Sequence, residues 1–497
     1  MIKIRKKDEA KIVIESDDSG ILREISEYFT FYVEGYKYMP AFRNKMWDGK
    51  VRLFDMRSHQ LPFGLLGKVA EFASARKYEL VVDPDIRPTL SATDEELDEF
   101  VKNLPLCSGG NAIQARDYQV DAFKKATQSQ RAILLSPTGS GKSLIIYMLS
   151  RYFLSKDMDR KVLIVVPTTS LVEQMTKDFA DYSLNDSEFD VEEEVHKIYS
   201  GKEKFDIEAS IVITTWQSAI KLPLDWFIAY GMVIGDEAHT FKAKSLTTIM
   251  DRLNKAYFRI GTTGTLDGGK VNELVLEGSF GPTYKVTSTR ELIDSETLAD
   301  LTIQALVIKY PDEVKKLMAK AKYQDEIDFI VSYANRNNFI TNLALDQSGN
   351  TLVLYNLVTK HGKPLYDMIK SKAKDRNVFF VSGEVNAEER ERIRELTEKE
   401  TGAIIVASSG TFSTGINIKN LHNIIFAAPT KSQIRVLQSI GRGLRKSDSG
   451  QPTVVYDLAD DLCWKKHKNY THNHAINRIK IYAKEGFKYN IHEVPMK

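Results

Sequence analysis

Short apolar runs rich in β-branched residues alternate with longer stretches of helical period through most of this chain. The runs fall at residues 132–135, 162–166, 211–213 and 232–234, and they return at 351–355, 378–381, 403–406 and 423–426. Runs without polar interruption are typical of strands buried on both faces, as in a parallel sheet covered by helices. The pattern stops near Thr287. It therefore predicts two α/β domains in tandem, at residues 112–290 and 347–456.

The segments around these two domains have a different pattern of apolar and polar residues. Residues 1–90 contain strand-like runs at 12–14 and 51–54 and a polar-capped helical stretch at 18–28, which predicts a small α+β domain. Residues 91–111 combine an acidic stretch with a Gly-Gly pair and predict a linker. Residues 291–346 are charged and helical in period, which indicates a connector or an insertion. Residues 457–497 predict a basic helical tail.

Composition narrows the class of protein. The chain has 497 residues, 42% hydrophobic and 27% charged, which suits a globular protein of roughly three domains. No stretch approaches the ~20 apolar residues that span a bilayer, and the basic N-terminus lacks the apolar region of a secretory signal. Cys107 and Cys463 are far apart and fit no disulfide or metal spacing. These features predict a protein of a reducing cytoplasm.

The net charge of +2 conceals two basic regions. Residues 36–57 hold six Lys and Arg against two Asp, and residues 463–497 hold eight Lys and Arg against two Glu, with five aromatic residues among them. Either region alone is ordinarily a solvated face. Together, around the nucleotide site described next, they favour a nucleic-acid partner.

A phosphate-binding loop is the clearest chemical motif. Ser136-Pro137-Thr138-Gly139-Ser140-Gly141-Lys142-Ser143 follows the apolar run 132–135 and precedes an apolar helical stretch. Glycines at this spacing let backbone N–H groups turn toward phosphates, and the helix N-terminus adds a favourable dipole. We expect Thr138 to Ser143 to bind ATP, with Lys142 on the β- and γ-phosphates and the Ser143 hydroxyl on Mg²⁺.

An acidic pair follows the strand-like run 232–234. Asp236 and Glu237 are expected at the carboxyl edge of the same sheet, facing the phosphate loop. Two carboxylates after a strand alone would ordinarily belong to a helix start. About ninety residues after a phosphate loop, they predict a hydrolytic pair, in which Asp236 holds Mg²⁺ and Glu237 deprotonates the attacking water.

Asp236-Glu237-Ala238-His239 resembles motif II of the superfamily 2 helicases, and further motifs follow in that family's order across residues 112–455. The resemblance implies two RecA-like domains with ATP and Mg²⁺ between them. It implies adenine contacts by Arg116 and Gln119, nucleotide contact by Gly415, and backbone contacts to nucleic acid by Thr168, Thr215 and Thr411. Ser136 and Asn417 depart from the family's usual residues, and Asn417 puts the usual ribose or coupling contact in doubt.

The segment Gln438 to Arg445 resembles motif VI of the same family. Arg442 and Arg445 are three residues apart and therefore share one helix face. Two such arginines are ordinarily only solvated. The resemblance implies that they act as arginine fingers with Gln438 beside them, stabilising charge on the γ-phosphate when the domains close.

Two basic segments leave alternatives open. Arg43, Lys45, Lys50 and Arg52 surround Trp47, which is either a stacking surface for nucleic acid or a core residue of the small domain. His472-Asn473-His474 invites a nuclease or metal interpretation. We expect neither, because no acidic residue is close in sequence and the period fits a basic helix. His474, Arg478 and Tyr482 instead share one face that packs on the motor or contacts DNA.

The motifs predict a nucleic-acid-stimulated ATPase. The segment 40–50 and the acidic box resemble helicases of T-even bacteriophages, which implies a monomeric enzyme in the cytoplasm of the infected bacterium. It would unwind or branch-migrate branched DNA, duplex and single-stranded DNA and RNA–DNA hybrids, with phage recombination or replication proteins as partners. A duplex translocase shares every motif. An ATPase subunit of a larger complex, or a binding protein with an inactive site, is less consistent with the residues present.

Overall fold

The computed structural model describes every residue except 200–202, 206, 242, 267–268, 299, 386, 412–419, 430–451 and 497. The chain divides into two compact units. The first comprises Met1–Ser136 and Gly141–Val286, and the second comprises Pro137–Ser140 and Thr287–Lys497. Each unit contains a seven-stranded sheet in which every paired strand is parallel. The predicted fold class, two parallel α/β domains in tandem, is confirmed.

The sheet of the first unit has the strand order β11-β12-β10-β13-β14-β9-β15. Its strands are β9 (Arg131–Leu135), β10 (Lys161–Val166), β11 (Val195–Ile198), β12 (Ile211–Thr215), β13 (Tyr230–Gly235), β14 (Phe258–Thr263) and β15 (Thr283–Lys285). Alternate residues of β10 enter two different hydrophobic cores, Ile164 on one face and Leu163 on the other. The uninterrupted apolar runs in the sequence follow from this burial on both faces.

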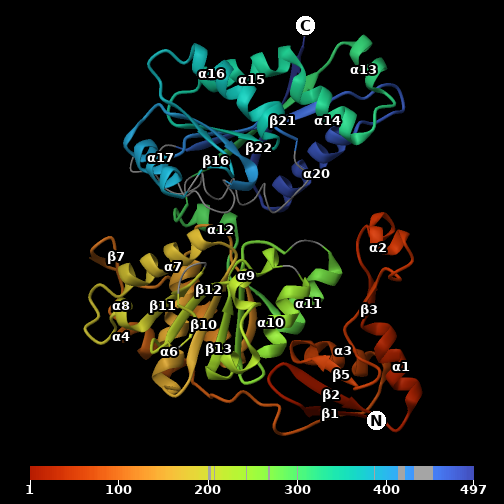
Figure 1. Ribbon diagram of the computed structural model, residues 1–497, viewed down its shortest axis with the longest axis vertical. Coiled ribbons are helices and arrows are strands. Elements are labelled where there is room, and N and C mark those ends of the chain that lie inside the picture. Colours follow the sequence, from red (N-terminus) through yellow and green to blue (C-terminus); the bar gives the residue numbers. More distant parts are fainter. Residues whose placement is uncertain are drawn as a thin grey trace. The chain divides into compact units, whose positions relative to one another are not determined.

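Helices cover both faces of this sheet (Figure 1). They are α5 (Asp117–Ser129), α6 (Lys142–Lys156), α7 (Thr169–Tyr182), α8 (Val191–Glu194), α9 (Trp216–Ala219), α10 (Ala243–Arg252) and α11 (Lys270–Phe280). Residues of α5, α6 and α7 form one core with the sheet, and residues of α9, α10 and α11 form the other. The carboxyl ends of the strands stay uncovered by these layers, which leaves that edge for the site.

The N-terminal segment is a small α+β domain built on the sheet β5-β2-β1-β6. Its elements are β1 (Ile2–Lys6), β2 (Lys11–Glu15), α1 (Ser19–Tyr28), β5 (Gln60–Pro62), α3 (Leu66–Arg76) and β6 (Leu80–Val82). A two-stranded ribbon, β3 (Thr30–Tyr32) with β4 (Lys50–Arg52), extends from it and carries the short helix α2 (Pro40–Arg43) beyond the strand ends (Figure 1). We call residues 30–52 the basic ribbon.

The N-terminal domain packs directly against the first α/β domain. Leu274 of α11 belongs to the same hydrophobic core as residues of the small domain. Gly64 lies so close to α11 that a Cβ there would be 1.9 Å from the carbonyl oxygen of Glu277. Only a glycine permits that approach of two backbones. Arg131, the first residue of β9, donates to the backbone and the carboxylate of Glu9 at 2.8 and 2.7 Å.

Residues 91–111, expected to be a linker, are folded onto the first α/β domain. They contain α4 (Asp94–Asn103), capped by Thr93, and the short hairpin β7 (Cys107–Ser108) with β8 (Asn111–Ala112). Leu97 of α4 is fully buried in the core that α5 and α6 share. The acidic first turn of α4 concealed this helix in the sequence, because those charges suit the positive end of its dipole as well as they suit a solvated linker.

The second unit has the strand order β18-β19-β17-β20-β21-β16-β22. Its strands are β16 (Leu301–Lys309), β17 (Thr351–Tyr355), β18 (Val378–Val381), β19 (Ile404–Ser408), β20 (Asn423–Phe426), β21 (Thr453–Asp461) and β22 (Lys488–Pro495). Its helices are α12 (Thr289–Asp294), α13 (Asp312–Met318), α14 (Tyr323–Ser332), α15 (Ala334–Asp346), a π-helical turn (Val358–Gly362), α16 (Lys363–Lys372), α17 (Ala387–Lys399) and α20 (Tyr470–Lys484).

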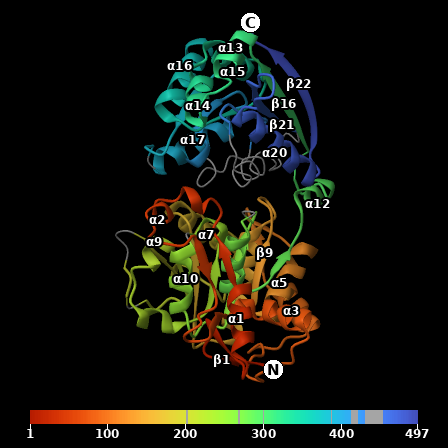
Figure 2. The ribbon, with the colours of Figure 1, turned by 90° about the vertical axis from the view of Figure 1, so that its right-hand side faces the viewer.

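Two strands of this sheet differ from the expectation. Residues 291–346 were expected to be a helical connector, but β16 lies within them and pairs with both β21 and β22. The tail was expected to be helical throughout. In the structure α20 is its helical part, whereas β22 is a strand that forms the sheet edge beside β16 (Figure 2). Among the described residues, no helix is long and apolar enough to cross a membrane.

The face of α20 predicted to pack on the motor does so within the second unit. Arg478 is 1% exposed and Tyr482 is fully buried. Arg478 pairs with Asp457 of β21, with 2.8 Å between Nη2 and Oδ1, and the Tyr482 hydroxyl donates to Oδ2 of the same carboxylate at 2.9 Å. These side chains are therefore structural, and they join the tail to the sheet.

Candidate functional site

The phosphate loop connects the carboxyl end of β9 to the first turn of α6. Gly139 and Gly141 have φ of 86° and 76°, in the left-handed region where a side chain is strained. The Ser140 hydroxyl donates to the carbonyl of Pro137 at 2.8 Å. The backbone of Ser136 donates to the carbonyl of Thr263 at 2.8 Å, which ties the base of the loop to β14. The loop thus has the conformation that the glycine spacing predicts.

Lys142, the first residue of α6, lies against the acidic pair. Its ammonium nitrogen is 3.6 Å from Oε1 of Glu237 and donates to the carbonyl of Ser136 at 3.2 Å. Both side chains are largely buried, with 13% and 18% of their surfaces exposed. The lysine predicted for phosphate and the carboxylate predicted for water are therefore neighbours across the sheet edge, although about ninety residues separate them in sequence.

Asp236 comes directly after β13 and is 7% exposed. Its Oδ1 accepts hydrogen bonds from the Thr262 hydroxyl at 2.6 Å and from the backbone of Glu237 at 2.9 Å. Burial, and then the charge of Glu237, raise its pKa to about 6 in spite of the nearby Lys142. This carboxylate is buried, it accepts two hydrogen bonds, and no full positive charge balances it. Such a group favours the binding of a cation.

Glu237 has φ of 48°, an uncommon conformation for a residue with a side chain. Oε2 of Glu237 is 3.4 Å from Nδ1 of His239. The same ring nitrogen lies 2.6 Å from the hydroxyl of Thr263 at the end of β14. The strained backbone and these contacts fix the carboxylate at the edge. Strain of this kind recurs at active sites.

Three further side chains complete the site, and sequence reasoning missed one of them, Tyr182. Thr262 and Thr263 end β14 and hold Asp236 and His239, and Tyr182 ends α7 with its hydroxyl 2.8 Å from that of Ser143. The Thr262-Thr263 pair is visible in sequence, because residues 262–265 take the place of motif III in the order of the superfamily 2 helicase motifs. Nothing near Ser143 in sequence points to Tyr182, because α7 reaches it only through the fold.

The predicted adenine contacts lie near the loop. Gln119 is 2% exposed; its Oε1 accepts from the backbone of Arg116 at 2.9 Å and its Nε2 is 3.5 Å from the carbonyl of Gly141. The side chain of Arg116 is exposed and donates to the Tyr118 hydroxyl at 3.3 Å. Gln119 is therefore held at the end of the phosphate loop, and Arg116 projects into solvent beside it.

The threonines predicted to contact nucleic acid lie near strand ends, and two of them cap the helices that follow. Thr168 precedes α7 and Thr215 precedes α9, and each hydroxyl accepts from a backbone N–H three residues on, at 3.4 and 3.3 Å. Both follow strands that pair in register, β10 and β12. In the second unit, Thr411 accepts from the Ser408 hydroxyl at 2.7 Å and is 9% exposed. Local hydrogen bonds therefore account for all three hydroxyls.

The basic ribbon exposes cations around stacked aromatic rings. Tyr32 and Tyr36 stack with 4.6 Å between centroids, and the ammonium of Lys50 lies 5.0 Å from the Tyr32 ring. Arg43 and Lys45 are exposed. At the tip, Tyr38 is 86% exposed, a large fraction for an aromatic side chain. This surface has the mixture of charge and ring faces that suits a nucleic-acid strand.

Trp47 and Arg52 are more constrained than the sequence suggested. Trp47 is half-buried and donates from Nε1 to the carbonyl of Lys50 at 2.9 Å, and it is not a member of the small domain's described core. Arg52 forms an ion pair with Asp48, which raises the pKa of Arg52 and lowers that of Asp48. Gly415, Asn417, Gln438, Arg442 and Arg445 lie outside the described residues.

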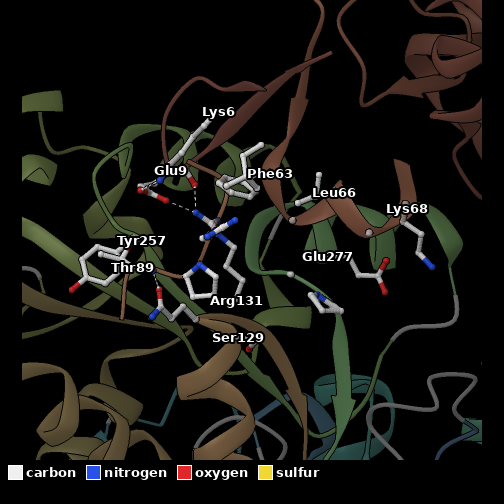
Figure 3. A pocket seen from close by; sticks show the side chains of 18 of the residues that line it. Lys6, Glu9, Phe63, Leu66, Lys68, Thr89, Ser129, Arg131, Tyr257 and Glu277 are labelled. Carbon is white, nitrogen blue, oxygen red and sulfur yellow. Dashed lines mark hydrogen bonds and ion pairs between the residues drawn. The ribbon is translucent and has the colours of Figure 1, made fainter. Parts of the chain in front are cut away.

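A separate cavity of about 310 Å³ lies between the N-terminal domain and the first α/β domain (Figure 3). Phe63 and Glu9 line it from the small domain, and Arg131, Tyr257 and Glu277 line it from the α/β domain. Arg131 begins β9, whereas the phosphate loop follows the other end of that strand. The cavity is therefore at the amino edge of the sheet and is not the nucleotide site.

Three family models match the chain. Residues 1–83 match "DNA helicase UvsW, N-terminal", residues 112–268 match "Type III restriction enzyme, res subunit", and residues 335–447 match "Helicase conserved C-terminal domain". Together they cover the small domain and parts of both α/β domains.

Individual relatives extend the similarity over the whole length. The chain is 37% identical over 504 aligned residues to "ATP-dependent DNA helicase uvsW" of Enterobacteria phage T4, covering 98% of each protein. The crystal structure of T4 UvsW aligns with 99% of each chain at a TM-score of 0.54. A "DNA 3'-5' translocase" of Sulfurisphaera tokodaii is 23% identical over 73% of this chain and 86% of its own length.

Proposed function

This chain belongs to the UvsW helicases of superfamily 2 and is an ATP-dependent helicase, and from that premise we propose that it unwinds or branch-migrates branched DNA and RNA–DNA hybrids. The substrates of this activity are R-loops, stalled forks and Holliday junctions. The observation that carries the proposal is the meeting of Lys142 and Glu237 at 3.6 Å in a unit that also holds a basic, aromatic ribbon.

The phosphate loop binds ATP through backbone N–H groups of residues 138–143. The positive φ of Gly139 and Gly141 supports this role, because it turns the peptide groups of the loop inward. The donor set fits Mg²⁺, since the hydroxyl of Ser143 and the buried carboxylate of Asp236 are hard oxygen ligands at one strand edge. When bound, Mg²⁺ neutralises charge on the β- and γ-phosphates.

Lys142 and Glu237 exchange partners during the cycle. The ammonium of Lys142 lies 3.6 Å from Oε1 of Glu237. A γ-phosphate carries more negative charge than one carboxylate, so it takes over the ammonium when ATP binds. Glu237 then loses its cationic neighbour, becomes a stronger base and accepts a proton from the attacking water. His239 keeps the carboxylate oriented from the opposite side.

The second domain supplies the positive charge that stabilises the transition state of hydrolysis. We assign Arg442 and Arg445 to the γ-phosphate, with Gln438 beside them and Gly415 at the nucleotide, on the strength of the motif resemblance. Closure on ATP and opening after hydrolysis then alternate the nucleic-acid contacts of the two domains, which moves the enzyme along the strand.

Nucleic acid contacts the basic ribbon and the strand ends of both domains. Arg43, Lys45 and Lys50 pair with phosphates, and the exposed rings of the ribbon stack on bases. Thr168 and Thr215 contribute through the backbone N–H groups of the helices they cap, and Thr411 contributes at a strand end of the second domain. The N-terminal domain thereby binds duplex beside the point where the motor separates strands.

Translocation on duplex without strand separation is the second candidate. The observation that favours it is the similarity to a protein named as a DNA translocase, which covers most of both chains. A forked-duplex unwinding assay run beside a triplex-displacement assay separates the two functions. If the protein displaces the triplex strand but leaves the fork intact, translocation on duplex is its function and strand separation is not.

The principal test measures ATP hydrolysis and unwinding over single-stranded DNA, duplex, fork, Holliday junction and RNA–DNA hybrid. We expect the fork, junction and hybrid to stimulate most. Lys142→Arg and Glu237→Gln should lose hydrolysis and unwinding while DNA binding persists. Replacing Arg43, Lys45 and Lys50 by Ala should weaken DNA binding and flatten its salt dependence. Unwinding by either ATP-site variant, or equal stimulation by all five substrates, would contradict the proposal.

A further inference from the structure

We propose that Asp461, Cys463 and His472 form a transition-metal site in the second α/β domain, and that its preferred ion is Zn²⁺. A carboxylate oxygen, the thiol sulfur and a ring nitrogen of these residues lie within 4.8 Å of one another. The phosphate loop and the acidic pair contribute nothing to this cluster. It is independent of the proposed helicase activity and does not rest on it.

The fold brings together residues that the sequence keeps apart. Asp461 is the last residue of β21, Cys463 is the second residue of the following loop, and His472 lies in the first turn of α20. The loop turns back on itself through a pair of backbone hydrogen bonds between Trp464 and His467. A metal role for His472 was rejected from sequence because no acidic residue is near it. In the folded chain Asp461 is that residue.

A buried network fixes this loop before any ion arrives. Oδ1 of Asn469 accepts from the backbone of Leu462 at 3.1 Å and from the thiol of Cys463 at 3.2 Å. The amide nitrogen of Asn469 donates to Glu326 at 2.9 Å, and Glu326, 2% exposed, also accepts from the backbone of Thr471 at 2.7 Å. Preorganisation of this kind reduces the cost of assembling ligands around an ion.

Each of the three side chains has an atom that can still bind an ion. Nδ1 of His472 is buried and has no hydrogen-bond partner among the described residues. Asp461 accepts from the ammonium of Lys309 at 2.8 Å and from the backbone of Cys463 at 3.1 Å, which leaves lone pairs on both oxygens. The Cys463 thiol donates to Oδ1 of Asn469, and it gives up its proton when the sulfur binds an ion.

The chemistry of the donors selects the ion. A thiolate and an imidazole are poor ligands for Mg²⁺ or Ca²⁺, whereas Zn²⁺ binds both together with a carboxylate. Tetrahedral bonds of about 2.0–2.3 Å place ligand atoms about 3.3–3.8 Å apart, so small side-chain rotations complete the site, and water takes the fourth position. The Cys463 thiol releases one proton as its sulfur binds the ion.

Local charge is compatible with a divalent cation. Lys309 contributes one positive charge near the cluster, but Glu493 shares it at 3.0 Å. The carboxylates of Asp461 and Glu493 and the thiolate of Cys463 carry three negative charges against that one. Zn²⁺ therefore brings these groups to neutrality. An ion pair between Lys309 and Asp461 with no metal role is the competing explanation.

Cobalt binding tests the site directly, because a Co²⁺–thiolate bond has a charge-transfer absorption band. The full chain, freed of metal with a chelator, is titrated with Co²⁺ and then with Zn²⁺ in the absence of nucleotide. We expect one equivalent of Co²⁺ to produce the band and Zn²⁺ to abolish it. Cys463→Ser should lack the band, and His472→Gln should bind Co²⁺ at least about tenfold more weakly.

Cys107→Ser is the matched control, since Cys107 is the chain's other cysteine and is fully buried in the first unit. This variant should keep the band. Alkylation of the unmutated chain gives a second measurement that needs no folded variant: Zn²⁺ should slow the reaction of Cys463. Absence of the band, its persistence in Cys463→Ser, or alkylation that Zn²⁺ leaves unchanged would overturn the proposal.

Discussion

Glu9→Gln should loosen the N-terminal domain from the first α/β domain. Glu9 forms ion pairs with Lys6 at 2.5 Å and with Arg131 at 2.7 Å. The guanidinium of Arg131 also lies 3.9 Å from the ring centre of Phe63, so it is enclosed by the small domain. Gln removes the negative charge and preserves the size of the side chain. Two cations then remain in a largely buried place without the carboxylate that pairs with both of them.

The expected cost follows from burial. Only 12% of the Arg131 side chain and 16% of the Glu9 side chain are exposed, so solvent screens the pair weakly. Burial lowers the pKa of Arg131 to about 10 even with Glu9 present, which shows how unfavourable a charge is at that position. Removing one partner of a buried pair costs about 3–5 kcal/mol. Because the carbonyl of Glu9 still accepts from Arg131, we expect about 3 kcal/mol, the lower end.

Hydrogen exchange measures this loss where it occurs. Protection of the amides in β1 and β2 should fall by about two orders of magnitude in Glu9→Gln, whereas amides of β10 should change little. Glu24→Gln is the control, because its pair with Arg76 lies on the same domain but has 45% and 40% of the two side chains exposed. That change should cost less than about 1 kcal/mol. Equal effects of the two substitutions would refute the reasoning from burial.

Three further predictions concern other parts of the chain. Burial lowers the pKa of His361 to about 3, so below pH 6.5 the unfolded chain takes up a proton that the folded chain refuses. Stability should then fall by about 1.4 kcal/mol per pH unit, and urea unfolding of His361→Leu should lack that slope. Gly49→Ala places a Cβ 2.3 Å from the ring of Tyr36 at φ +81°, so DNA affinity should fall, whereas Gly35→Ala, at φ +69° but with nothing within 4 Å, carries only the backbone strain and should lose less affinity. Gly141→Ala, at φ +76° and 2.3 Å from a packed side-chain amide, should weaken nucleotide binding at least about tenfold; unchanged affinity for a fluorescent ATP analogue would contradict the loop geometry.

The central strands could be predicted because their burial on both faces leaves an uninterrupted apolar run, as in β10. Edge strands lack that signal. Nearly every residue of β22 is exposed, so nothing in its composition distinguishes it from a basic tail. Strand β16 alternates buried and partly exposed positions for much of its length, and it stands between helical segments, which concealed it as part of a connector.

The nucleotide site was predictable where the chemistry is contiguous. The segment 136–143 and the pair Asp236-Glu237 each carry their own spacing, and a parallel sheet necessarily brings such strand ends to one edge. Tyr182 and His472 were not predictable in this way, because their partners, Ser143 and Asp461, reach them only through packing of whole elements. Sequence order carries no information about such pairs.

The direct packing of Gly64 on α11 gives the enzyme a mechanical property. The small domain has no slack at this junction, because two backbones are in contact without a side chain between them. Arg131 adds a second fixed point, and five residues of β9, about 17 Å of extended chain, join it to the phosphate loop. The basic ribbon and the acidic pair Asp236-Glu237 therefore share one rigid frame within the first unit. A nucleic acid bound by the ribbon therefore moves together with this part of the ATP site.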